Sequence, residues 1–136
     1  MRLTLPLLAS LMLASPGAWA ETAGLAVELN KMEADGGACR LTFVATNGAA
    51  EAVDSAVFET VLFDTEGSVD RLTLFDFGAL PVGRARVRQF QVDGLPCARL
   101  GRVLFNGASA CTVAGAASGV CDAAAVTSRA PAELLR

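Results

Sequence analysis

Short apolar stretches alternate with turn signals along most of this chain, and this pattern constrains the fold more than any other feature. Leu41, Phe43 and Ala45 alternate with polar side chains just before the turn pair Asn47-Gly48. Alternation with a period of two is typical of a β-strand that has one face in a core. Because several such stretches recur at short intervals, the sequence predicts an all-β sandwich.

These signals predict seven strands, at residues 25–30, 39–46, 56–64, 69–77, 84–92, 102–105 and 123–129. In the fifth strand the apolar positions change parity between Val87 and Phe90, so we expect a β-bulge near Arg88 and Gln89. The pair Asn106-Gly107 should end the sixth strand. We expect a flexible tail at residues 130–136, for which a single helical turn is the alternative.

Residues 1–20 have the layout of a secretory signal peptide. Arg2 supplies a positive charge, residues 3–13 are mostly apolar, and Ala18 and Ala20 satisfy the A-x-A rule for cleavage. The apolar run is shorter than the ~20 residues that a membrane-spanning helix needs. We therefore expect cleavage after Ala20, export to the periplasm, and a mature chain with no membrane span whose domain covers residues 21–129.

Four cysteines follow this leader: Cys39, Cys97, Cys111 and Cys121. An even number of cysteines after an export signal predicts disulfides, and their spacing includes neither C-x-x-C nor a paired zinc knuckle. If the strands alternate in direction, the start of the second, the end of the fifth and the start of the sixth share one end of the sandwich. This geometry pairs Cys39 with Cys97 and leaves Cys111 for Cys121.

Side chains suited to catalysis are scarce. The chain has no histidine and no tyrosine, so the commonest general base and metal ligand is missing. The carboxylates of Asp54, Glu59, Asp64, Glu66 and Asp70 fit solvated strand faces and turn caps, and Asp64 suits a turn in which it accepts backbone N–H bonds. We expect no catalytic residue, no cofactor and no metal; the alternative is an enzyme of unfamiliar type that uses carboxylates.

Every second residue from 84 to 88 is an arginine: Arg84, Arg86 and Arg88. On a strand these guanidiniums would share one face, about 7 Å apart. They are candidate contacts for an acidic partner or a lipid headgroup, and the alternative is pairing with carboxylates such as Asp76 and Asp70. The chain as a whole has 11 basic and 14 acidic residues, which argues against nucleic acid as a partner.

Residues 39–105 contain a pattern of turns and strand ends. Its residues are Asn47, Leu62-Phe63-Asp64, Gly67, Pro81-Val82-Gly83 and Phe90. The pattern resembles the FxLYD-like group of extracytoplasmic domains. That resemblance implies an immunoglobulin-like antiparallel β-sandwich of about seven strands, here stabilised by disulfides.

The whole chain is also similar to small exported alphaproteobacterial proteins, through residues 27–31 and 101–106. Because histidine and catalytic motifs are missing, we expect a non-catalytic periplasmic binding or accessory (scaffold) protein. The whole-chain resemblance implies that the partner is another envelope protein, in an inner-membrane proton-channel complex of the TolQ and ExbB sort.

The first testable prediction is that the mature protein begins at Glu21. Intact-mass measurement of protein recovered from the periplasm of a bacterial host should show that residues 1–20 have been removed. A mass that still includes those residues would contradict the signal-peptide assignment.

Overall fold

Residues 23–136, which the computed structural model describes, fold into nine strands and one short 3₁₀ turn. The predicted signal peptide and its cleavage site after Ala20 lie outside the described residues. The strands are β1 (Leu25–Asp35), β2 (Ala38–Asn47), β3 (Val53–Asp64), β4 (Val69–Leu80), β5 (Ala85–Val92), β6 (Leu100–Val113), β7 (Ala116–Ala117), β8 (Ala125–Ser128) and β9 (Glu133–Leu135), and the turn is η1 (Cys97–Arg99).

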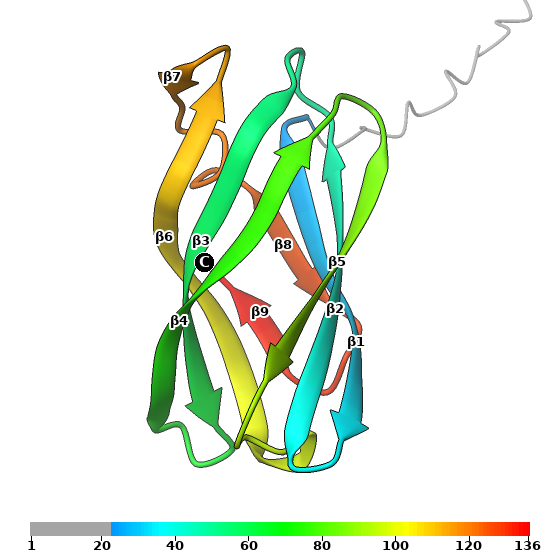
Figure 1. Ribbon diagram of the computed structural model, residues 1–136, viewed down its shortest axis with the longest axis vertical. Helices are drawn as coiled ribbons and strands as arrows, with labels where there is room; N and C mark the ends of the chain where they lie inside the picture. The colour runs from blue at the N-terminus through cyan, green and yellow to red at the C-terminus, as the bar shows by residue number, and fades with distance from the viewer. Residues whose placement is uncertain (1–22) are drawn as a thin grey trace, which may run out of the picture.

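Two sheets pack face to face (Figure 1). The first sheet has the order β5-β2-β1-β8, and the second has the order β4-β3-β6-β7, with β9 also paired to β6. The first, second and fifth strands thus share one sheet, while the third, fourth and sixth share the other. The predicted disulfide-stabilised β-sandwich is confirmed.

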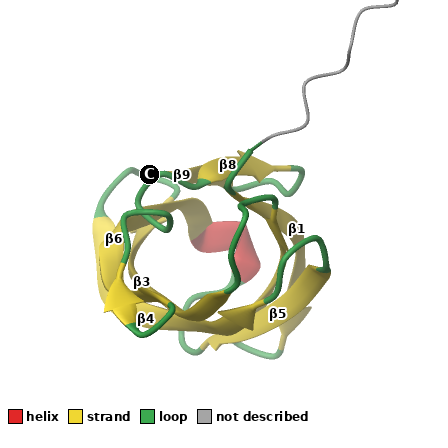
Figure 2. Cartoon of the chain, turned by 90° about the horizontal axis from the view of Figure 1, so that it is seen from above, coloured by secondary structure: helices red, strands yellow, loops and turns green. Residues whose placement is uncertain are grey.

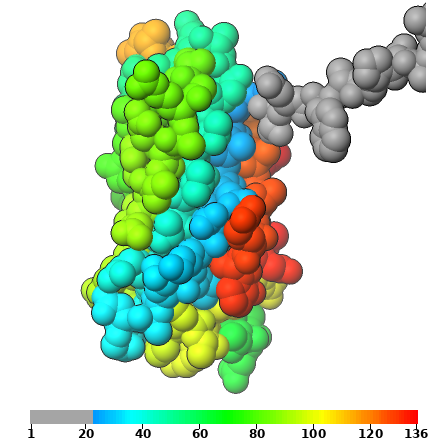
Figure 3. Space-filling view, turned by 90° about the vertical axis from the view of Figure 1, so that its right-hand side faces the viewer, coloured from blue at the N-terminus to red at the C-terminus, as the bar shows by residue number. Residues whose placement is uncertain are grey.

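The C-terminal segment differs from the prediction of one closing strand and a flexible tail at residues 130–136. β8 pairs in parallel with β1, the chain then turns, and β9 pairs in parallel with β6. Figure 2 shows β8 and β9 closing one side of the sandwich, and Figure 3 shows the end of the chain lying along β1. Ala132 and Leu134 are buried in the core, so burial of apolar surface holds this segment in place.

Phenylalanine rings fill the space between the sheets. Phe43 and Phe90 come from the first sheet, and four more rings come from the second: Phe58, Phe75, Phe77 and Phe105. Phe43 lies 5.5–6.0 Å from four of the other rings, measured between centroids. Aromatic pairs of this kind contribute about 0.5–1.5 kcal/mol each beyond their buried area. Strand alternation places these rings inward and so produces the core.

The pair Asn106-Gly107 does not end the sixth strand as predicted. β6 continues to Val113, and its register against β3 shifts at Asn106 and again at Ser109. A β-bulge absorbs an extra residue at the cost of a local bend, which lets the strand run through a sequence that reads as a turn.

The turn from β3 to β4 forms as predicted around Asp64. Its Oδ1 accepts hydrogen bonds from the backbone N–H groups of Glu66 and Ser68, at 2.9 and 3.0 Å. Gly101 packs against the same turn, where a Cβ atom would lie 2.6 Å from the carbonyl oxygen of Asp64. Only glycine leaves room for this close approach.

Both predicted disulfides are confirmed. Cys39–Cys97 joins the start of β2 to η1, with 4.8 Å between Cα atoms, and Cys111–Cys121 joins the end of β6 to the loop before β8, with 6.1 Å. The first pairing follows from strand direction, since Cys39 is paired with Val92 at the end of β5. Two structural disulfides fit an extracytoplasmic, oxidising compartment.

The two bridges should differ in their contribution to stability. Cys39–Cys97 spans 58 residues and Cys111–Cys121 spans 10. By the loop-entropy model their removal should lower the free energy of unfolding by about 4 and about 3 kcal/mol, respectively. Urea unfolding of the double variants Cys39→Ala/Cys97→Ala and Cys111→Ala/Cys121→Ala measures both values, and a larger loss for the short bridge would contradict this ranking.

Candidate functional site

The three arginines predicted as a partner contact lie on or just before β5, an edge strand of the first sheet. Arg84 is exposed, whereas Arg86 and Arg88 are half-buried. The register between β5 and β2 is unbroken along the whole of β5, so the β-bulge predicted near Arg88 and Gln89 is wrong.

Strict alternation therefore decides which side chains of β5 face inward. Phe90 packs against the core and Val92 belongs to it, and Arg86 and Arg88 have the same parity as these two residues. Val87 lies on the opposite face and is 58% exposed. The strand places a valine in water because the inward positions at this open side of the sandwich are occupied by arginine.

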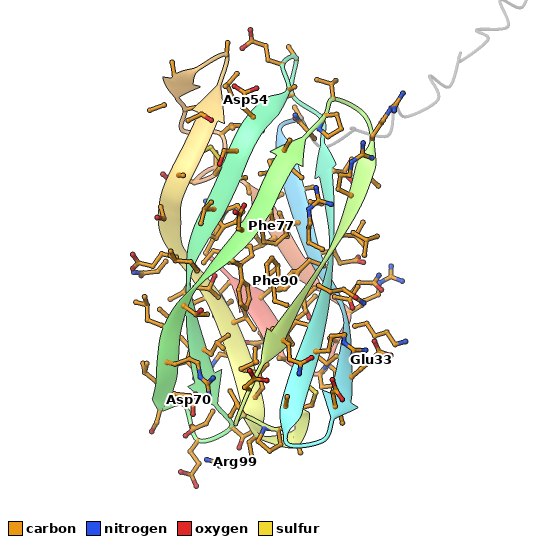
Figure 4. The ribbon with its side chains drawn as sticks, in the orientation of Figure 1. Glu33, Asp54, Asp70, Phe77, Phe90 and Arg99 are labelled. Atoms are coloured by element: carbon orange, nitrogen blue, oxygen red, sulfur yellow. A yellow bond between two sulfur atoms is a disulfide. The ribbon has the colours of Figure 1, made fainter. Side chains whose placement is uncertain are left out.

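Arg88 connects the edges of the two sheets. Its Nε donates a hydrogen bond of 2.7 Å to the carbonyl oxygen of Phe77, and its Nη2 donates one of 3.2 Å to that of Ala79. Both carbonyls belong to β4, the edge strand of the second sheet. In Figure 4, Phe77 and Phe90 lie between β4 and β5 on this side of the molecule. Arg88 thus satisfies part of a strand edge that would otherwise stay unpaired.

Arg71 makes the reverse contact, from β4 to the chain that follows β5. It lies on β4, and its Nη1 donates a hydrogen bond of 2.6 Å to the carbonyl oxygen of Asp93, which follows β5. Its Nε bonds the carboxylate of Asp70 at 2.7 Å. Two arginines therefore hold β4 and β5 together, one near each end.

The alternative pairing of the arginines with Asp70 and Asp76 is not formed. Asp70 pairs with Arg71, and Asp76 accepts the backbone N–H of Gly78 at 2.8 Å. Among residues 23–136, no salt bridge includes Arg84, Arg86 or Arg88. Within this part of the chain Arg86 bonds only the neighbouring carbonyl of Ala85, so Arg84 and Arg86 keep most of their donors for solvent or a partner.

Two of the other candidate carboxylates bond different neighbours. Asp54 accepts the backbone N–H of Gly115, and Glu59 accepts the side-chain amide of Asn106. Within the described part of the chain, no three acidic or cysteine side chains are grouped so that they could hold a metal ion. On the exposed end of β1, a hydrogen bond from Lys31 lowers the pKa of Glu33.

A cavity of about 250 Å³ opens beside β6, between β7 and β9. The side chains of Phe58 and Phe105 line it, together with the polar groups of Asn106, Asp122 and Arg136. Pockets for drug-sized ligands are usually about 300–1,000 Å³. This cavity is smaller and suits a single side chain.

Sequence reasoning missed an apolar surface on the outer face of the second sheet. Leu72 and Leu74 are exposed there, while Phe75 and Phe77 of the same strand point inward. The signal was present, because β4 has apolar residues at positions of both parities where a half-buried strand should have them at one.

No family model, curated protein or solved structure matches this chain. The described residues contain no helix of the length and hydropathy needed to cross a membrane. Function therefore has to be inferred from the surface of the sandwich.

The contacts of Arg88 with β4 predict that it contributes more to stability than Arg84 or Arg86 does. Arg88→Ala should lower the free energy of unfolding by about 1–3 kcal/mol, because two carbonyls of β4 lose a charged donor. Arg84→Ala and Arg86→Ala should each change it by less than about 0.5 kcal/mol. Urea unfolding of the three variants measures the difference, and equal losses would show that Arg88 does not connect the sheets.

Proposed function

We propose that this protein is a non-catalytic binding or accessory protein of the periplasm, and that Arg84 and Arg86 contact an acidic surface of another envelope protein. One observation carries the proposal. Arg84 is exposed just before β5, Arg86 is half-buried on β5, and neither has a carboxylate partner among residues 23–136. Cations placed in this way favour a negatively charged partner.

Two features support the periplasm as the compartment. Residues 1–20 have the sequence of an export signal. All four cysteines are joined in disulfides, which form and persist outside the reducing cytosol.

The resemblance to FxLYD-like domains supports a scaffold role. Asn47 is fully buried, and its Nδ2 donates hydrogen bonds to the carbonyl oxygens of Glu51 and Leu80. The backbone carbonyl of Asn47 accepts a hydrogen bond from the N–H of Gly83, which lies in the Pro-x-Gly turn of the pattern. Phe90 packs in the core. We infer that residues of this pattern hold turns and strands in place, which suits a module that presents its surface to a partner.

The whole-chain resemblance suggests which partner this is. It implies a place beside inner-membrane proton-channel complexes of the TolQ and ExbB sort, and we infer that this chain is a periplasmic subunit of such a complex. β5 is an edge strand with one side unpaired, and a partner strand can add to an edge of this kind.

The proposal predicts loss of the partner when the two free arginines are reversed. The tagged full-length chain is expressed in its own host, and proteins that co-purify from detergent-solubilised envelopes are identified by mass spectrometry. Arg84→Glu/Arg86→Glu should abolish co-purification because it places carboxylates against an acidic surface. Arg88 is left unchanged, since its contacts with β4 belong to the fold.

The matched control is Arg99→Glu/Arg129→Glu, which makes the same change in charge on exposed side chains elsewhere. Arg129 pairs with Glu28 at 3.2 Å, and an exposed pair of this kind contributes little to stability. Arg99 lies at the far end of the sandwich from the turn that precedes β5 (Figure 4). The control should retain the partner. If both double variants fold with both disulfides and both retain the partner, the arginines are not the contact.

A further inference from the structure

A row of apolar side chains crosses four strands on the outer face of the second sheet. Leu72 of β4 is paired with Val61 of β3, Val61 with Leu104 of β6, and Leu104 with Leu135 of β9. Residues paired directly across strands project to the same face of a sheet. Leu62, Val103 and Leu134, which are chain neighbours of three members of the row, belong to the hydrophobic core, so the row itself faces outward.

The two ends of the apolar row are exposed, whereas Val61 in its middle is 8% exposed and Leu104 is half-buried. Leu72 is 57% exposed and Leu135 is 38% exposed, and β4 adds Leu74 at 55% and Val69 at 61%. Within residues 23–136, these are four of the six large apolar side chains that are exposed; the other two are Val82 and Val87. Scattered apolar side chains are normal on a surface, but a contiguous group of this kind marks an interaction site.

Charged groups around the apolar row are mainly acidic. Glu59, Asp76 and Glu133 have the parity of the outer face on β3, β4 and β9. Their main counter-charge is Arg102, whose guanidinium lies 5.6 Å from the centroid of the Phe63 ring. Asp70 is already paired with Arg71, and Arg136 bonds the carbonyl of Asp122. The patch therefore has an excess of negative charge.

The excess of negative charge distinguishes among the partners that could cover the apolar row. In a face-to-face dimer the carboxylates of one copy would approach those of the other, and like charges at an interface are costly. An anionic lipid surface would be repelled for the same reason. A segment that combines apolar side chains with lysine or arginine on both flanks can pack against the apolar row and pair with the acidic residues around it.

The dimensions of the apolar row favour a helix as that segment. Three steps between neighbouring strands, at about 4.8 Å each, give a row about 14 Å long. A helix rises about 1.5 Å per residue, so side chains at positions i, i+4, i+7 and i+11 cover about 16 Å. We propose that the apolar row binds a basic amphipathic helix of another protein, laid across the strands of the second sheet. This surface is separate from the arginines of β5.

The test uses three synthetic peptides and the mature chain. The first has leucine at i, i+4, i+7 and i+11 with lysine on the flanks, the second has glutamate in place of lysine, and the third is a scramble of the first. Fluorescence anisotropy should show binding of the lysine peptide, and both other peptides should bind at least about tenfold more weakly. Binding should also weaken as salt concentration rises, because exposed charges are screened.

Protein variants locate the binding. Leu72→Ser/Leu135→Ser should weaken binding of the lysine peptide at least about tenfold. The matched control, Val82→Ser/Val87→Ser, removes one exposed valine from the connection between β4 and β5 and one from β5, and should leave binding unchanged. Equal binding of the scrambled peptide, no binding of the lysine peptide, or equal effects of the two variants would overturn the proposal.

Two further measurements address the other occupants. Sedimentation of the mature chain should show a monomer, and it should not bind vesicles of anionic phospholipid. A dimer that dissociates in Leu72→Ser/Leu135→Ser would assign the patch to a second copy, and vesicle binding lost in the same variant would assign it to a membrane. Either result would contradict the proposal that the apolar row binds a helix.

Discussion

Contact among phenylalanine rings between the two sheets is the interaction on which the rest of the structure depends. Phe43 of the first sheet contacts Phe75, Phe77 and Phe105 of the second, and Phe75 stacks on Phe90 with 4.2 Å between centroids. These rings join the sheets and leave two open sides. On one side β8 and β9 cross from sheet to sheet, and on the other Arg88 and Arg71 connect β4 with β5. The two disulfides hold loops at the strand ends.

Because rings, arginines and the C-terminal strands each hold a different part of the sandwich, the remaining surface groups are available for partners. Arg88 donates hydrogen bonds to carbonyls of β4 and so belongs to the fold, whereas Arg84 and Arg86 keep most of their donors for a partner. The outer face of the second sheet carries leucines that the core does not need, since Phe58, Leu62 and the other inward residues already fill it. A basic edge and an apolar face with an acidic rim can therefore serve different partners without disturbing the phenylalanine core.

Local rules explain what the sequence predicted correctly. Strand alternation and turn residues predicted the sandwich, and strand direction predicted both disulfides, because these depend on near neighbours and on a simple reversal of direction. The C-terminal crossing depends on Ala132 and Leu134 covering an open side, and a segment rich in alanine gives no periodic signal for it. The inward position of Arg88 depends on carbonyls of β4, and the outward leucines became visible only once the strand faces were assigned.

Nuclear magnetic resonance of the arginine Nε–H groups in the mature chain most directly tests the claim that arginine connects the sheets. The Nε–H of Arg88 donates a hydrogen bond of 2.7 Å to a carbonyl of β4, so it should give a resolved resonance that exchanges slowly with solvent. The corresponding groups of Arg84 and Arg86 should exchange rapidly. Rapid exchange at all three arginines would contradict the account, because the side of the sandwich between β4 and β5 would then be open.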